Sequence, residues 1–210
     1  MTAKLTKRAV MLICAILLSG FGAIGQGLEL HVFGGGNITD RFDVNGGTAW
    51  IYGSAIFGAS VWYQTNNHFG YELEYLRQNT NAEVQSTSLY DTDIPMVLNY
   101  ILAGGHWLFE LENAEKMDFN LGIKGGAVGF IPQTDRYESG WQFALGFNAG
   151  AKYYLTERIG IRLQFHLLVP LQFAGGGFWF GNGGSGVSST GFATITQLGM
   201  IGGIFYRFTH

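Results

Sequence analysis

Large apolar residues alternate with small or polar residues at every second position along most of this chain. From Phe69 it reads Phe-Gly-Tyr-Glu-Leu-Glu-Tyr, and from Ile159 it reads Ile-Gly-Ile-Arg-Leu-Gln-Phe-His-Leu. In an extended strand this period places every bulky side chain of a segment on one face. Residues 117–124 and 141–148 repeat the pattern. A helix would scatter these charges around its axis, so the alternation predicts β-strands.

The same period predicts eight strands, separated by connections of alternating length. The strands are expected near residues 27–36, 50–65, 68–79, 93–110, 116–132, 139–155, 158–174 and 192–208. Most exceed the roughly 9 to 11 residues that a tilted strand needs to cross a bilayer. The connections at 64–68, 111–116 and 155–158 are short, whereas those at 37–49, 79–92, 133–138 and 175–191 are mostly longer. This layout predicts an all-β fold, an eight-stranded antiparallel transmembrane up-and-down β-barrel with both termini on the short-turn, periplasmic side.

Composition excludes several other classes of protein. The chain has 210 residues, with 33 glycines, 13% charged residues and a formal net charge of -3. Average proteins have about 7% glycine and about 25% charged residues. An apolar content of 47% excludes a disordered chain, and the charge balance excludes a polybasic nucleic-acid binder. No segment after residue 25 offers about 18 consecutive apolar residues, so a helical membrane protein is also excluded.

The first 25 residues have the pattern of a secretory signal peptide. Lys4, Lys7 and Arg8 precede an apolar run, and Ala23-Ile24-Gly25 ends in the small residues that a signal peptidase reads. We therefore expect a signal peptide at 1–25 and one barrel domain at 26–210. An uncleaved anchor is the alternative, although the apolar stretch is short for one. Cleavage would also remove Cys14, the only cysteine, so no disulfide is expected in the mature chain.

Alternation alone does not say which face of the barrel meets water. A soluble barrel of the lipocalin type turns its apolar face inward, whereas a membrane barrel turns it toward lipid. Here the large side chains gather on one face, and glycine, alanine, amides and charges gather on the other. The lumen of an eight-stranded barrel is narrow and suits small and polar residues. The sequence therefore favours the membrane barrel, with the soluble barrel as the alternative.

The inward face is expected to carry a polar network. Its members are Glu29, His31, Glu72, Glu74, Asp118, Lys124, Lys152, Arg162 and His166, with Asn99, Asn120, Asn148 and Gln164 among them. Burying a charge without a partner is costly, so cross-strand ion pairs are expected, and Lys124, Lys152 and Arg162 are the best partners for Glu72 and Glu74. Two hypotheses remain open: a structural plug of ion pairs, and a path for protons or ions.

Aromatic residues are expected where the barrel meets the membrane surface, because their amphipathic rings settle at the headgroup level. The expected interfacial residues are Trp50, Trp62, Trp107, Trp141, Tyr153, Tyr206 and Phe208. A glycine-rich segment near the C-terminus also carries Phe178, Trp179 and Phe180. These three form either a ligand-contacting surface patch or a segment at the outer membrane interface or over the barrel mouth.

Signals of chemistry are sparse. None of the five histidines has a serine within two residues, and no HExxH or CxxC motif is present. The glycine runs at 34–36 and 175–177 lack the lysine and hydroxyl residues of a phosphate-binding loop. The sequence therefore predicts no catalytic residue, no cofactor and no metal site.

Three segments carry a resemblance to a known family. Residues 66–75, 93–100 and 153–160 resemble the outer-membrane β-barrel domain family of small porin-like or OmpA-like eight-stranded barrels, especially those of Bacteroidetes-type bacteria. The resemblance covers residues 27–208 and transfers no catalytic residue. One departure is the C-terminus, where Thr209 and His210 follow Phe208 although such chains commonly finish on an aromatic residue read by the barrel assembly machinery.

The resemblance and the strand pattern together imply an integral outer-membrane protein of a Gram-negative bacterium, with a structural or cell-surface interaction role and no wide pore. The expected partners are outer-membrane lipids and, during biogenesis, the barrel assembly machinery. A monomer that binds no nucleic acid is expected. Two alternatives remain open: passage or binding of small hydrophobic molecules, and a lipid A modifying barrel enzyme.

Overall fold

The computed structural model describes residues 27–44, 47–86, 90–110, 116–134, 139–171 and 196–208. No helix in these ranges is long and apolar enough to cross a membrane. They contain ten strands, which are β1 (Leu28–Asn37), β2 (Asp40–Val44), β3 (Gly47–Ile51), β4 (Ser54–Asn66), β5 (Phe69–Ser86), β6 (Tyr90–Glu110), β7 (Met117–Pro132), β8 (Gly140–Tyr154), β9 (Ile159–Leu171) and β10 (Gln197–Phe208). The predicted signal peptide at 1–25 lies outside the described residues and stays a prediction.

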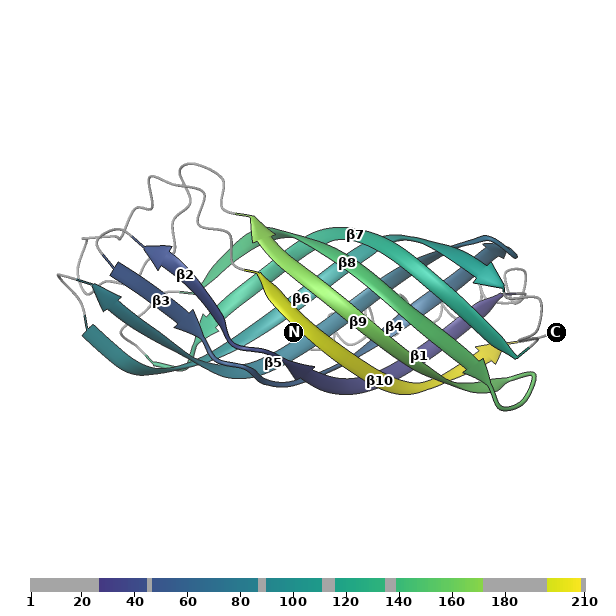
Figure 1. Cartoon of the computed structure of the whole chain (residues 1–210), viewed down its shortest axis with the longest axis horizontal. Coiled ribbons are helices and arrows are strands. Elements are labelled where there is room, and N and C mark those ends of the chain that lie inside the picture. The colour runs from purple at the N-terminus through teal and green to yellow at the C-terminus, as the bar shows by residue number, and fades with distance from the viewer. Residues whose placement is uncertain are drawn as a thin grey trace, which may run out of the picture.

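Eight of these strands close into an antiparallel barrel. The sheet order is β2-β3-β5-β4-β1-β10-β9-β8-β7-β6, and an additional β5–β6 pairing joins the ring. Strands β1 and β4 to β10 therefore form the wall, and β2 and β3 lie outside the closed ring. Figure 1 shows the tilted wall strands and the two extra strands at one end. The predicted eight-stranded antiparallel barrel is confirmed.

The strand pairing fixes how far the barrel is staggered. Following the paired residues around the wall from Leu28 leads to Leu198, whose carbonyl oxygen accepts a hydrogen bond from the amide of Ile38. After one full turn around the barrel, the paired position on β1 has moved ten residues, from position 28 to position 38. Such a stagger tilts the strands of a barrel by roughly 35 to 45°. The tilt lets side chains distant in sequence meet inside the barrel.

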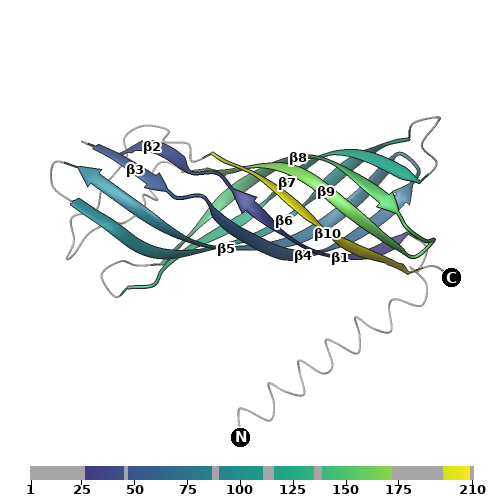
Figure 2. The same cartoon turned by 60° about the horizontal axis from the view of Figure 1, so that its bottom comes forward.

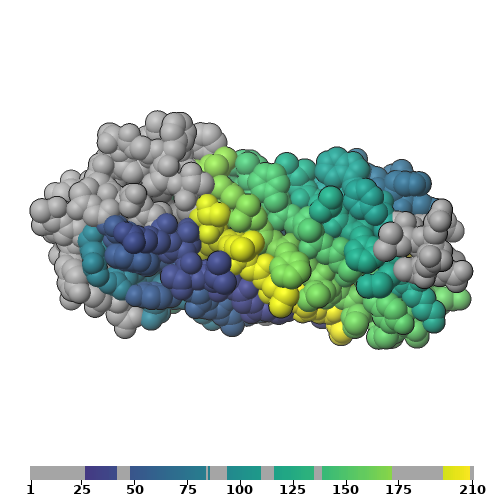
Figure 3. Space-filling model, viewed as in Figure 1, coloured from purple at the N-terminus to yellow at the C-terminus, as the bar shows by residue number. Residues whose placement is uncertain are grey.

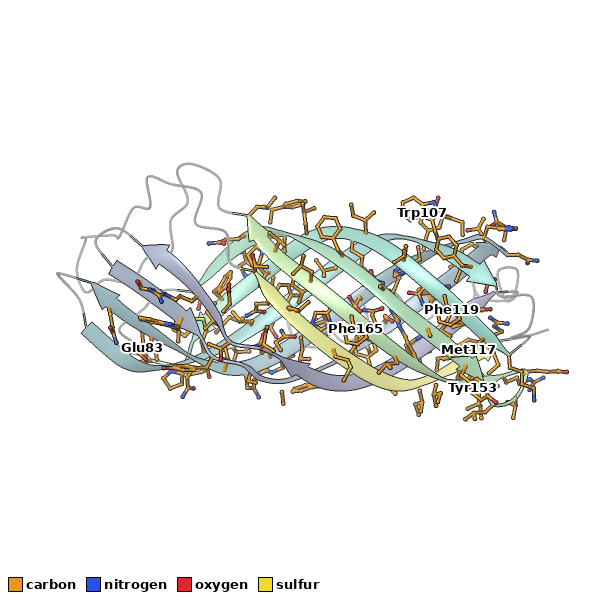
Figure 4. The ribbon with its side chains drawn as sticks, viewed as in Figure 1. Glu83, Trp107, Met117, Phe119, Tyr153 and Phe165 are labelled. Atoms are coloured by element: carbon orange, nitrogen blue, oxygen red, sulfur yellow. The ribbon has the colours of Figure 1, made fainter. Side chains whose placement is uncertain are left out.

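The two faces of the wall differ completely in character. On β9, Ile161, Leu163 and Phe165 are 45 to 56% exposed, whereas Arg162 and Gln164 between them are at most 3% exposed. Figure 3 shows the outer surface of β7 to β10, and in Figure 4 Phe165 projects from its middle. A large apolar surface turned outward and charges turned inward are the reverse of a soluble barrel. The outer face fits lipid, and the fold is a transmembrane barrel.

One end of the barrel carries a sheet that the sequence did not predict. Residues 37–49 and 79–92 were expected to be loops, but the first range contains β2 and the start of β3. In the second range β5 continues to Ser86, and β6 begins at Tyr90. Strand β3 pairs with the upper part of β5, and β2 pairs with β3. We call these projecting strands the loop-side extension, and Figures 1 and 2 show it at the end opposite the C-terminus.

The extension forms because its inward positions are apolar even though its sequence looks loop-like. Ile51, Ala82, Ile94 and Met96 are at most 2% exposed. Residues 79–85 alternate amide or carboxylate side chains with small or β-branched residues, so this segment lacks the bulky residues by which the other strands were recognised. The predicted strand at 50–65 is interrupted at Gly53, where an added Cβ would lie 2.6 Å from the carbonyl oxygen of Asn37. This close approach lets β3 and β4 follow one another along β5.

Candidate functional site

Two glutamates of β5 form the centre of the barrel interior. The Glu72 carboxylate lies 2.6 Å from Lys124 Nζ of β7 and 2.5 Å from Arg162 Nη1 of β9. His106 Nε2 of β6 lies 2.8 Å from its second oxygen. Glu74 pairs with the same lysine at 2.7 Å. These contacts join four strands of the wall across the lumen, and we call them the central cluster.

A second cluster, the turn-side cluster, lies nearer the short turns. The Glu29 carboxylate lies 3.0 Å from Lys152 Nζ, 2.6 Å from Arg207 Nη2 and 3.0 Å from His31 Nε2. The Tyr154 hydroxyl donates to Asp118 Oδ2 over 2.7 Å. The Arg207 side chain is 24% exposed, so this cluster reaches the mouth of the barrel on the turn side.

Trp62 fills the space between the two clusters. Its side chain is fully buried, with Lys152 Nζ 4.1 Å from its ring centroid and the His106 ring 4.3 Å away. A cation over an aromatic face is attracted by the ring quadrupole. Trp62 was predicted to lie at the membrane interface, and this prediction is wrong. Its neighbour Tyr63 faces outward instead, because two adjacent aromatic residues cannot share one face of a strand.

Toward the loop-side extension the interior changes to neutral amides. Asn37 Nδ2 donates to Gln78 Oε1 over 3.0 Å and to Gln197 Oε1 over 3.3 Å. The Tyr100 hydroxyl also donates to Gln197, over 2.9 Å. His166 Nε2 lies 2.7 Å from Asn37 Oδ1. Each of these groups is at least nine-tenths buried and has a polar partner, as buried polar groups require.

Apolar side chains fill much of the loop-side half of the interior, contrary to the expectation of a polar lumen throughout. The buried set there includes Ile56, Leu76, Leu98, Leu102, Val128, Phe130 and Leu168. On β6, β7 and β9 bulky residues stand next to one another, as in Val97-Leu98, Phe130-Ile131 and Leu167-Leu168. Both faces of the wall are therefore apolar at these positions, and the prediction that the large side chains gather on the lipid-facing side fails here.

All nine residues of the predicted polar network occupy inward positions. Asp118 is half-buried and the other eight are at most 3% exposed. The structure brings Glu72 together with Lys124 and Arg162, whereas Lys152 pairs with Glu29 instead of the β5 glutamates. Asn99 was expected inside, but it shares the outward register of Ile101, and its Oδ1 accepts from the Tyr75 hydroxyl over 2.8 Å.

The expected interfacial aromatics other than Trp62 face outward. Tyr206 is 40% exposed and Trp141 is 59% exposed, and the exposures of Trp107, Tyr153 and Phe208 lie between these values. Figure 4 shows Trp107 and Tyr153 near the turn-side end. Trp50 belongs to the loop-side extension, where Arg41 lies 5.6 Å from its ring. Phe178, Trp179 and Phe180 lie outside the described residues.

Sequence reasoning missed several members of the interior. His106, Tyr154 and Arg207 were not assigned to it, although all three contact its carboxylates or hydroxyls. The signal was present on β6, where Trp107 and Phe109 mark the outward register and leave His106 on the inward one. Arg207 follows in the same way from Tyr206 and Phe208, which both face outward.

The charged side chains of the interior balance one another. Lys124, Lys152, Arg162 and Arg207 face Glu29, Glu72, Glu74 and Asp118, so the two signs of charge are equal in number in these two clusters. Ser60 donates to Glu72 over 2.6 Å inside the central cluster, on the side of the wall that faces away from lipid. Within the described ranges no group of three metal-ligating side chains gathers. This arrangement can fix strands to one another and close the lumen.

Comparisons with known proteins agree with the fold. No family model and no curated protein matches the sequence. Among solved structures, Neisserial surface protein A is similar with a TM-score of 0.57 and 12% identity, over 87% of this chain and 98% of that one. Ail of Yersinia pestis matches with 15% identity over 86% of this chain and 99% of its own, at a TM-score of 0.43. The chain has the fold of the small eight-stranded outer-membrane β-barrels.

Proposed function

We propose that this chain is an integral outer-membrane protein of a Gram-negative bacterium with a structural or cell-surface interaction role and no wide pore. The observation that carries the proposal is the plugged interior: Trp62, Lys124 and Lys152 are at most 2% exposed and lie in a lumen that is already narrow. An eight-stranded barrel holds side chains inside and leaves no aqueous channel. The role is non-enzymatic in this proposal, and the protein acts as a monomer with outer-membrane lipids as its constant partners.

The loop-side extension supports an interaction role. It carries four strands beyond the part of the wall where β4 pairs with β5, and Glu83 projects from it in Figure 4. A sheet held rigid beyond the membrane can present side chains to a partner, because sites on regular elements are more precise than sites on flexible loops. In the proposed orientation this end faces outside, and the turns and both termini face the periplasm.

Epitope accessibility in intact cells tests the location and the orientation together. An epitope inserted between β5 and β6, at residues 87–89, should be bound by antibody on whole cells. The same epitope in the connection between β6 and β7, at residues 111–115, should be bound only after the outer membrane is permeabilised. Labelling of the second site in intact cells would contradict the orientation, and recovery of the protein in the soluble fraction would contradict the membrane location.

A second candidate function is binding of small hydrophobic molecules within the loop-side half of the barrel. The apolar residues there favour it, since Leu98, Leu102 and Val128 face inward without charges among them. Passage through the whole barrel is not favoured, because an apolar molecule would have to cross the central cluster and desolvated ion pairs. A long-chain alkane should raise the thermal unfolding midpoint of the protein up to a saturating concentration. Loss of this rise when Leu102 is replaced by Gln would support this candidate.

A further inference from the structure

Along the six wall strands that the structure describes in full, the outer face is neutral. On β1, β4, β7, β8, β9 and β10, which the structure describes in full, no outward position holds a charged residue. On β5 the outward series Phe69, Tyr71, Leu73 and Tyr75 is followed by Arg77 and then by Asn79 and Asn81. A cation therefore stands on the lipid-facing side of the barrel, directly above an apolar surface.

The apolar outward run on this strand is also shorter than the runs on β8 and β9. It covers positions 69 to 75 on β5, seven residues, whereas it covers positions 141 to 153 on β8 and 159 to 171 on β9, thirteen residues each. A strand tilted across a full hydrocarbon layer needs about 9 to 11 residues. The run on β5 is too short for that thickness, and the runs on the opposite side are long enough.

Two polar side chains at this place, Tyr75 and Arg77, reach toward the loop-side end. Arg77 Nε donates to Asn79 Oδ1 over 3.3 Å, one outward position further along β5. The Tyr75 hydroxyl donates to Asn99 Oδ1, although Tyr75 itself is paired with Ile101. Long side chains at a membrane surface extend in this way to place their polar ends in the headgroup layer. The Arg77 guanidinium belongs to that layer, because an arginine costs about 2 to 4 kcal/mol at the midplane of a bilayer and about 0 to 1 near its surface.

We propose that Tyr75, Arg77 and Asn79, with the buried Asn99 holding the Tyr75 hydroxyl, form a binding surface for the phosphate headgroups of the loop-side lipid leaflet. We propose also that the hydrocarbon layer is thinner beside β5 and β6 than beside β8 and β9. We call this surface the polar step. Its occupant is a phosphorylated lipid, since a guanidinium complements a phosphate and the surface is continuous with the lipid-facing wall. The inference rests on the proposed membrane location, and it adds an asymmetry that this location does not require.

Two matched cysteine positions test the thinner layer. Asn79 lies ten residues from Phe69, the outward aromatic at the turn end of β5, and Phe143 lies ten residues from Tyr153, its counterpart on β8. We would make N79C and F143C separately in a Cys14→Ser background and fold each into phosphatidylcholine vesicles. The probe is a charged maleimide that does not cross membranes. The N79C thiol should react at least about tenfold faster than the F143C thiol. A tenfold ratio needs a free-energy difference of only about 1.4 kcal/mol between the two thiols in reaching water.

Equal labelling rates for the two thiols in vesicle-bound protein would overturn the inference and leave the membrane location intact. Rapid labelling of both thiols in protein that does not float with the vesicles would instead contradict the proposed function. Folding of each variant is checked by the shift in gel migration on heating, so slow labelling of a misfolded chain is recognised.

The role of the cation is tested by Arg77→Leu in the N79C protein. We expect labelling of the thiol to slow toward the F143C rate, because the headgroup layer is no longer held at this level. When phosphatidic acid, whose phosphate is not offset by a choline cation, replaces part of the phosphatidylcholine, the thermal midpoint of the otherwise native protein should rise, and R77L should lose this rise. Inorganic phosphate should not replace the lipid. The control Arg41→Leu removes a cation from β2, off the wall, and should keep both properties. An unchanged labelling rate and an unchanged lipid response in R77L would overturn the proposal.

Discussion

At the scale of single residues, Glu72 is the side chain on which most of the interior depends. It contacts Lys124, Arg162 and His106 at once and is fully enclosed. Removing one partner of a buried ion pair leaves uncompensated charge, which costs about 3 to 5 kcal/mol. We expect Glu72→Gln to lower the free energy of unfolding by about that amount in urea titrations of the vesicle-bound protein.

The matched control for this variant is Glu83→Gln on the loop-side extension. Glu83 accepts hydrogen bonds from Tyr52 and Gln85 at the surface, where such contacts contribute about 0 to 1 kcal/mol. The control should shift the unfolding midpoint little. If Glu72→Gln also left the unfolding midpoint unchanged, the central cluster would have to be hydrated. The hypothesis of a path for ions would then gain support over the hypothesis of a structural plug.

A second residue-scale prediction concerns Gly160, whose inward side is occupied by an aromatic ring. An added Cβ would lie 2.3 Å from Phe205 Cζ and 2.5 Å from the carbonyl oxygen of Tyr153. We expect Gly160→Ala to destabilise the barrel by about 1 to 3 kcal/mol, the usual cost of overpacking. Gly140→Ala is the control, since nothing lies within 4 Å of its added Cβ. Equal thermal unfolding midpoints for the two variants would show that the Phe205 ring does not pack against Gly160.

At the scale of elements, the pairing of β1 with β10 closes the wall and completes the register of the barrel. Val32 pairs with Ile204 and both face outward. Residues directly opposite each other in an antiparallel pair have Cα atoms about 4.5 to 5.5 Å apart, which a disulfide can span. Cysteines at 32 and 204 should crosslink under mild oxidation, while cysteines at 32 and 208 should not. Crosslinking of the second pair instead, detected by gel migration without reductant, would contradict the register.

The β2–β3 hairpin should be dispensable for closure, because β1 pairs with β4 along its full length without it. Replacing residues 39–52 by a short glycine-serine linker should leave the heat-dependent shift in gel migration intact. Loss of that shift, with the protein remaining in a form that migrates as unfolded chain, would show that the hairpin is part of the folding unit of the barrel.

The elements also show what the sequence could predict. Strands with a clear period of two, such as 69–75 and 159–167, were placed correctly, and their inward charges followed from register. The prediction failed where that signal weakened. Residues 79–85 form a strand without bulky side chains, Trp62 and Tyr63 are both aromatic, and Leu98 follows another apolar residue. The alternating pattern alone does not show which of two adjacent apolar residues faces inward. That depends on which side chain fills the lumen, and strand pairing between residues distant in sequence determines this.

The partners of the ion pairs were less predictable than their positions. Glu72 meets Arg162 across the lumen, and Glu29 meets Lys152, because the stagger of the wall brings those strands to the same level. The stagger is set by the pairing of all eight strands together. A single sequence indicates which side chains face inward, but the position of each side chain along the barrel axis depends on the stagger of the whole wall.

At the scale of the whole molecule, the barrel combines a lipid-facing exterior with an interior closed by side chains. The turn-side and central clusters hold equal numbers of cationic and anionic side chains, and Trp62 lies between them. Nearer the loop-side extension, the amides around Asn37 and the apolar residues around Leu98 complete the filling. This filling of the interior supports the proposal that the barrel has no wide pore.

Conductance across a planar bilayer tests this central claim most directly. The purified, heat-modifiable protein should give no stable current steps at moderate voltage in salt solution, because buried side chains of the central cluster span the narrow lumen of an eight-stranded barrel. A parallel recording with an open porin under the same conditions establishes that channels are detected. Large, stable steps from the native protein would contradict the plugged interior.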